Sequence, residues 1–139
     1  MMRVVLDANV FVSAILTPHG ETARVLRAWR EEQFHLIVSE PIMREIGRVL
    51  LYPKLKKRHG WSPVMIRQFL EDLASVSILT PGEIHLSIIR DDPSDDRYLE
   101  CAVEGEADVI VSGDHHLRDL GSYRGIPILS VKEFFEVLV

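Results

Sequence analysis

Five short, mainly apolar runs rich in β-branched residues constrain the fold of this chain more than any other feature. They lie at residues 4–6, 34–38, 76–79, 109–111 and 126–129. Strands that face water on one side alternate apolar and polar residues, whereas strands covered on both faces are nearly continuous apolar runs. The sequence therefore predicts a five-stranded parallel sheet with helices on both faces, a three-layer α/β/α fold.

Helical periodicity occupies the segments between these runs. Apolar stripes predict helices over residues 21–32, 41–51 and 63–74, and Ser130 with Glu133 forms a capping-box pattern that opens a last helix. The loops that contain proline and glycine are too short to be domain linkers. A chain of 139 residues with 47% hydrophobic residues can bury a core, so we expect one domain over residues 1–139.

Cysteine content and hydropathy exclude several classes of protein. Cys101 is the one cysteine, so no disulfide can form within the chain, and no Cys/His cluster has the spacing of a structural zinc site. No apolar run has the length of a membrane span. We therefore expect a cytoplasmic protein without a membrane partner.

Charge is segregated along the chain, although the net charge of −5 taken alone argues against binding nucleic acid. Residues 91–119 contain ten acids and two arginines, whereas residues 44–58 contain one acid. The second segment is either a solvated loop around residues 54–58 or a track for a phosphate backbone. Its basic residues are the candidate nucleic-acid contacts: Arg44, Arg48, Lys54, Lys56, Lys57 and Arg58.

Two aspartates directly follow predicted strands. Asp7 ends the first apolar run, and Asp114 follows the run at 109–111 after Ser112 and Gly113. Ligands of open parallel sheets bind at the carboxyl ends of the strands, where these residues are expected to lie. Either aspartate by itself is also typical of a helix N-cap.

Further acids occupy helix positions where a solvated charge is not expected. Glu45 borders the apolar stripe of its helix, and Asp96 precedes Leu99 by three residues on the face expected to meet the sheet. Asp92 before Pro93 is typical of an N-cap with proline at the first helical position. Asp95 fits either a structural role in the first turn or a supporting role in a site, and we favour Asp96 as the site residue.

Four inward carboxylates would repel one another in a site of low dielectric unless a cation lay between them. Oxygen ligands suit Mg²⁺ or Mn²⁺, and no histidine or cysteine is expected at a matching position that would favour zinc. Magnesium held by carboxylates commonly takes phosphate oxygens as further ligands, so the pattern indicates phosphoryl chemistry.

Four segments, taken together, resemble a PIN-domain ribonuclease of the group described as toxin components of prokaryotic toxin–antitoxin systems. The resemblance spans essentially the whole chain, and its strongest motifs are Asp7-x-Asn9 and Ser112-Gly113-Asp114. It rests on Val5-Leu6-Asp7-Ala8-Asn9-Val10, on Glu45, on Asp95-Asp96-Arg97-Tyr98-Leu99, and on Val109-Ile110-Val111-Ser112-Gly113-Asp114-His115-His116-Leu117.

The resemblance implies an endoribonuclease that cleaves RNA with water activated by one or two Mg²⁺ or Mn²⁺ ions. The matching catalytic and metal-binding positions are Asp7, Glu45, Asp96 and Asp114, and Asn9 and Ser112 support the site. The implied partners are RNA and a cognate antitoxin protein, and a second copy of the chain is a further candidate.

Two other functions are compatible with parts of this pattern. One is a PIN-like module that binds RNA or a protein without cutting. The other is a phosphatase of the haloacid dehalogenase type, which also begins with a strand followed by aspartate. That chemistry needs a second acid two residues later, where this chain has Asn9, which cannot transfer the proton.

Overall fold

A computed structural model describes residues 1–89 and 92–138. Its sheet has the strand order β3-β2-β1-β4-β6-β5, and the first five of these strands are parallel. The parallel strands confirm the five predicted runs. They are β1 (Arg3–Leu6), β2 (His35–Ser39), β3 (Ile78–Thr80), β4 (Val109–Val111) and β6 (Ile126–Leu129). The boundaries of β1, β2 and β3 differ from the predicted ones by one or two residues.

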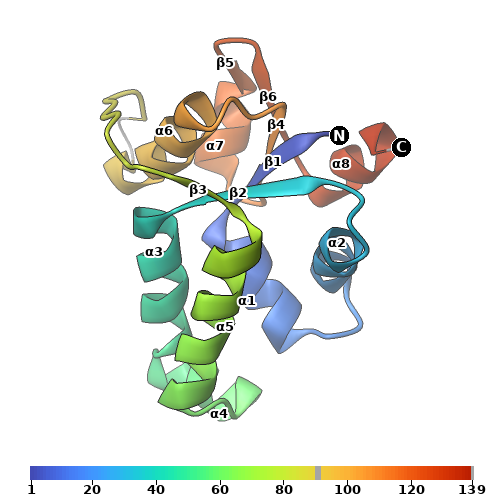
Figure 1. Cartoon of the computed structure of the whole chain (residues 1–139), viewed down its shortest axis with the longest axis vertical. Coiled ribbons are helices and arrows are strands. Elements are labelled where there is room, and N and C mark those ends of the chain that lie inside the picture. Colours follow the sequence, from blue (N-terminus) through green and yellow to red (C-terminus); the bar gives the residue numbers. More distant parts are fainter. Residues whose placement is uncertain (90–91, 139) are drawn as a thin grey trace.

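Helices cover both faces of the sheet, as the apolar strands require (Figure 1). One layer contains α1 (Ala8–Leu16), α2 (Glu21–Arg30), α3 (Glu40–Leu50) and α5 (Pro63–Val76). On the other side lie α6 (Asp96–Glu104), which packs against β1, β2 and β4, and α7 (His115–Leu120), which packs against β6. The last helix, α8 (Val131–Val137), contacts β6 and α2.

Helix starts follow the capping residues of the sequence. The side chains of Ser39, Ser62 and Ser130 accept hydrogen bonds at the starts of α3, α5 and α8, and Glu133 completes the predicted capping box at Ser130. A short 3₁₀ helix, η1 (Pro93–Asp95), begins at Asp92, so the prediction of an N-cap there is confirmed. Among the described residues, no helix is long and apolar enough to span a membrane.

Two details of the sequence interpretation are wrong. The basic run at residues 54–58 is not a loop but lies in the exposed helix α4 (Pro53–His59). Pro53 starts this helix, and Gly60 ends it with a φ of +67°, a left-handed conformation that glycine adopts readily. The sheet also has a sixth strand, β5 (Ser122–Tyr123), which pairs antiparallel with β6.

An extended segment, residues 82–89, is held along α6 by carboxylates, and we call it the strap. Glu104 accepts from the backbone N–H groups of Gly82, Glu83 and Ile84 at 2.7–3.2 Å. Further along α6, Glu100 accepts from Leu86 at 2.7 Å, and Asp96 accepts from Ile88 and Ile89.

The spacing of the strap matches that of the helix. Residues four apart on α6 are separated by about 6.0 Å along the helix axis, and two residues of extended chain span about 6.6 Å. The three acids, which are four residues apart on α6, therefore meet N–H groups that are two residues apart on the strap. The strap runs antiparallel to the helix: Glu104 accepts from Ile84, Glu100 from Leu86 and Asp96 from Ile88. Three of the acids of the 91–119 segment thus accept the hydrogen bonds that a neighbouring strand would otherwise accept from the strap.

We expect Glu104→Ala to release the first part of the strap, because three backbone N–H groups lose their charged acceptor. The free energy of unfolding should fall by about 1–2 kcal/mol. Hydrogen exchange at Gly82, Glu83 and Ile84 should accelerate. Glu71→Ala, at an exposed position of α5, is the matched control. Equal exchange rates in Glu104→Ala and the wild type would contradict the role of Glu104.

Candidate metal centre

The hydroxyl of Ser112 connects the ends of the two central strands. Leu6 pairs with Val111 in the register of β1 and β4, so the residues that follow them, Asp7 and Ser112, lie side by side. Ser112 Oγ donates to Asp7 Oδ2 at 2.7 Å and accepts from the Asp114 N–H at 2.9 Å. Asp7 is only 3% exposed and Ser112 is fully buried. The structure therefore brings together Asp7, Ser112 and Asp114, as the sequence predicts.

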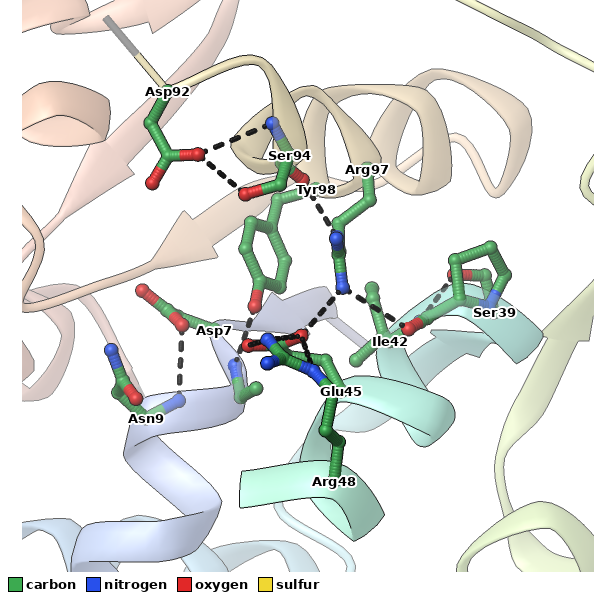
Figure 2. Close-up of polar contacts among 12 residues, drawn as sticks. Asp7, Asn9, Ser39, Ile42, Glu45, Arg48, Asp92, Ser94, Arg97 and Tyr98 are labelled. Atoms are coloured by element: carbon green, nitrogen blue, oxygen red, sulfur yellow. Dashed lines mark hydrogen bonds and ion pairs between the residues drawn. The ribbon is translucent and has the colours of Figure 1, made fainter. Parts of the chain in front are cut away.

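Both aspartates are also helix N-caps. Asp7 Oδ1 accepts from the Asn9 N–H at 3.0 Å, and Asp114 Oδ1 accepts from the N–H groups of His116 and Leu117 at 2.8 and 3.3 Å. The exposed side chain of Asn9 lies beside Asp7 (Figure 2). Capping and site membership are thus compatible, because capping fixes the direction of each carboxylate.

Asp95 lies near enough to Asp7 and Asp114 for their charges to raise its pKa. One ligand atom each of Asp92, Asp95 and His116 lie within 4.8 Å of one another, a spacing that one cation could bridge. Asp95 Oδ2 and His116 Nδ1 are buried atoms without a hydrogen-bond partner in the described structure. We expected no histidine at a matching position that would favour zinc, but the first turn of α7 brings His116 within ligand distance of Asp92 and Asp95.

Burial and charge repulsion both act on these acids. Burial, and then the charges of Asp114, Asp92 and Asp7, raise the pKa of Asp95 from 3.8 to about 7. Burial also raises the pKa of Asp7, against the hydrogen bonds from Ser112 and Asn9. A divalent cation would offset this repulsion and occupy the free oxygen of Asp95, so these residues fit Mg²⁺ or Mn²⁺.

Asp96 is buried, as expected, but its carboxylate points to the strap. It is 4% exposed and accepts from the backbone of Ile88 and Ile89, the latter at 2.9 Å. The neighbouring positions 95 and 96 therefore have different surroundings: Asp96 accepts from the strap, whereas the charges of nearby acids raise the pKa of Asp95.

Glu45 lies between two arginines. Arg97 Nη1 donates to Glu45 Oε2 at 3.0 Å, and Arg48 donates to both carboxylate oxygens. The Glu45 side chain is only 19% exposed, which agrees with its predicted place at the border of the apolar stripe. Figure 2 shows Glu45 below Arg97, with Tyr98 between this ion pair and Asp7.

Tyr98 connects α6 to the start of α1. Its hydroxyl accepts from the Ala8 N–H at 3.1 Å, and its side chain is 3% exposed. Burial raises the pKa of Tyr98, as does the nearby charge of Asp7. Tyr98 therefore stays a neutral phenol and satisfies the N–H group next to Asp7.

The predicted basic contacts divide into two groups. Arg44 and Arg48 lie on α3, the helix of Glu45, where Arg44 pairs with exposed Glu40 at 3.0 Å. The α4 residues lie at the far end of α3 from the sheet (Figure 1), and the eleven residues of α3 span about 16 Å. They are Lys54, Lys56, Lys57 and Arg58, and all are exposed.

Sequence reasoning did not assign Asp92, Arg97, Tyr98 or His116 to the site. The one sequence signal for Asp92 is the density of acids around Pro93, which is equally typical of a cap. No pattern in the sequence distinguishes His116 from His115, because only the start of α7 determines which imidazole turns toward Asp95.

The pKa of Asp95 predicts how stability depends on pH. The folded state holds this proton more tightly than the unfolded chain does, so stability falls as the pH rises from about 4 to 7. In metal-free buffer, the free energy of unfolding from urea titrations should fall less between pH 5 and 7.5 in Asp95→Asn than in the wild type. Mn²⁺ should raise wild-type stability more at pH 7.5 than at pH 5. Equal pH dependence in both proteins would refute the burial of Asp95 among acids.

Known proteins resemble this chain in sequence or in fold. The family described as "PIN domain" matches residues 3–116. Uncharacterized protein MJ1680 of Methanocaldococcus jannaschii is 33% identical over 143 residues, which cover 97% of this chain and 90% of that protein.

A solved structure has a similar fold. It is the crystal structure of VapBC2 from Rickettsia felis bound to a DNA fragment from their promoter. One of its chains matches with a TM-score of 0.61 and 12% identity, over 93% of this chain and 98% of that chain. That likeness shows the fold, and the match over residues 3–116 shows the family: the chain belongs to the PIN domain family.

Proposed function

We propose that this chain is a metal-dependent endoribonuclease and the toxin component of a toxin–antitoxin pair. The observation that carries the proposal is the cluster of carboxylates at the carboxyl edge of the sheet, in which Asp7 is buried and half-buried Asp95 keeps an oxygen without a hydrogen-bond partner among the described residues. Membership of the PIN domain family argues against the alternative of a phosphatase of the haloacid dehalogenase type. A PIN module that binds without cutting is disfavoured, because uncompensated carboxylates would repel a phosphate backbone.

The proposed ligands of Mg²⁺ or Mn²⁺ are Asp7, Asp95 and Asp114, with Glu45 at the edge of the site. Asp95 replaces Asp96 in this set, because Asp96 is bonded to the strap. Asp92 and His116 complete the surroundings of Asp95, and an imidazole there favours Mn²⁺ over Mg²⁺. When bound, the cation supplies the positive charge that lowers the pKa of water and stabilises phosphate oxygens.

The chain's own groups orient this site. Ser112 and the Asn9 N–H fix the two oxygens of Asp7, and Tyr98 occupies the Ala8 N–H that would otherwise compete for that carboxylate. Arg97 holds Glu45 in place. Arg44 and Arg48 are the proposed RNA contacts near the site, and the basic residues of α4 would meet RNA farther along its backbone.

An antitoxin partner is proposed by analogy of fold. The structure with the similar fold is that of VapBC2 from Rickettsia felis bound to a DNA fragment from their promoter. Expression of this chain in bacteria should arrest growth if it is a free toxin. Loss of that arrest in the Asp7→Asn variant would connect toxicity to the carboxylate site.

We expect the wild type to cleave single-stranded RNA with Mg²⁺ or Mn²⁺ and to stop when EDTA is added. Asp7→Asn should lower the rate by more than about 100-fold, because it removes a ligand charge. It should leave the thermal midpoint unchanged or higher, because it relieves repulsion among buried acids. Asp119→Asn on the exposed side of α7 is the matched control. Cleavage by Asp7→Asn at the wild-type rate would disprove the assigned site.

Asp95→Asn and Asp96→Asn separate the two neighbouring acids. Asp95→Asn should abolish cleavage without loss of stability, because its Oδ2 accepts no hydrogen bond from the described residues and the nearby acids disfavour its charge. Asp96→Asn should lower the free energy of unfolding by about 1–3 kcal/mol, because two backbone N–H groups lose a charged acceptor. Mn²⁺ affinity, measured by calorimetry below the thermal midpoint of each variant, should fall more in Asp95→Asn. The reverse order would restore Asp96 as the ligand.

A further inference from the structure

Glu45 differs from the other acids of the candidate metal centre, because arginines engage both of its carboxylate oxygens. Arg97 Nη1 donates to Oε2 at 3.0 Å, and Arg48 Nη2 donates to Oε1 at 2.7 Å and also to Oε2. The Glu45 and Arg97 side chains are 19% and 22% exposed, so water screens this ion pair only in part. We call these three residues the arginine clamp.

One side of the clamp is fixed to the backbone around it. Arg97 Nε donates to the Ser94 carbonyl at 2.6 Å, and its Nη1 also donates to the Pro41 carbonyl at 3.5 Å. The other side is looser, because the Arg48 side chain is 59% exposed. Arg97 therefore determines where the Glu45 carboxylate lies, and Arg48 adds a second positive charge to it.

Two other acids of the centre lack such compensation. Burial and neighbouring acids raise the pKa values of Asp7 and Asp95, and Asp95 Oδ2 accepts no hydrogen bond from the described residues. A cation that binds these aspartates relieves repulsion, whereas a cation that binds Glu45 first has to displace a guanidinium. A cation therefore gains less from Glu45 than from Asp7 or Asp95.

The clamp adjoins the metal centre through the first residues of α6. Arg97 is the second residue of this helix, and the next residue, Tyr98, accepts from the N–H group that follows Asp7. Figure 2 shows the ion pair of Arg97 and Glu45 on one side of the Tyr98 ring and Asp7 on the other. Glu45 therefore lies at the edge of the centre, where a cation and a guanidinium compete for it because their charges repel each other.

We propose that the arginine clamp is an autoinhibitory contact, which withholds Glu45 from the divalent cation and so weakens metal binding by the chain. The cation binds the three aspartates, and Glu45 joins them only where its bond to Arg97 is broken. Arg97 is thus a positioning residue that acts through Glu45, and it raises the metal concentration that loads the centre. This inference rests on the proposed function and describes the regulation of its metal centre.

Mn²⁺ affinity, measured by calorimetry on the full chain without RNA, tests the clamp. Arg97→Gln should raise this affinity by about tenfold or more, because a charge-assisted hydrogen bond no longer competes for Glu45. Arg124→Gln, in the exposed turn between β5 and β6, removes an equal charge and should leave the affinity unchanged. Unchanged Mn²⁺ affinity in folded Arg97→Gln would overturn the proposal.

A double-mutant cycle separates the release of Glu45 from the loss of positive charge at position 97. Loss of the charge alone would raise Mn²⁺ affinity by the same factor whether or not Glu45 is present. In the Glu45→Gln background, Arg97→Gln should therefore raise the affinity by a much smaller factor than in the wild type. Equal factors in the two backgrounds would show that Arg97 acts only as a nearby charge and would overturn the clamp.

Arg48→Gln provides a second variant, whose exposed side chain makes misfolding a minor concern. It should also raise Mn²⁺ affinity, but by a smaller factor than Arg97→Gln does, because exposed ion pairs contribute little. A lower Mn²⁺ affinity in Arg48→Gln than in the wild type would likewise overturn the proposal.

Crystals grown with Mn²⁺ show directly where the Glu45 carboxylate binds. It should coordinate the cation in Arg97→Gln and stay on the two arginines in the wild type, and coordination in the wild type would contradict the clamp. If Asp7 binds Mn²⁺ but Arg97→Gln leaves the affinity unchanged, the clamp fails alone. If the cycle shows the clamp but the wild type does not cleave RNA with Mn²⁺, the nuclease function fails alone.

Discussion

The buried hydroxyl of Ser112 determines the geometry of the site on which the proposed chemistry depends. It donates to Asp7 and accepts from the Asp114 N–H, so one group joins the ends of β1 and β4 and the starts of α1 and α7. The register of the two parallel strands places Asp7 and Ser112 side by side, and the short connection from Ser112 to Asp114 brings Asp114 to the same hydroxyl. The centre of the sheet therefore fixes Asp7 and Ser112, whereas Asp95 comes from η1.

The many acids of this chain have different physical roles, and the structure separates them. Glu104, Glu100 and Asp96 replace a strand partner for the strap and are satisfied by N–H groups. Asp95 and Asp7 are the acids whose pKa rises through burial. The same helix, α6, thus stabilises the strap with one set of carboxylates. Asp95, the residue just before its first turn, keeps an oxygen without a hydrogen-bond partner among the described residues. Uncompensated charge, and not acidity in general, marks the site.

The sequence predicts features that depend on local periodicity or on strand ends. The five parallel strands, the capping box at Ser130 and the juxtaposition of Asp7 with Asp114 follow from apolar runs and from the rule that ligands bind at the carboxyl edge of a parallel sheet. Choosing between Asp95 and Asp96 requires knowing where the strap lies, because the amides of Ile88 and Ile89 engage Asp96. Helix periodicity cannot reveal such a contact. Helix periodicity likewise cannot reveal the ion pair between Arg97 and Glu45.

The location of a bound Mn²⁺ ion tests the central claim most directly. Anomalous diffraction from crystals grown with Mn²⁺ reports its position independently of any activity. We predict a peak coordinated by oxygens of Asp7, Asp95 and Asp114, with Asp96 still bonded to the amides of Ile88 and Ile89. A peak coordinated by Asp96, or no peak near Asp7 at millimolar Mn²⁺, would contradict this account.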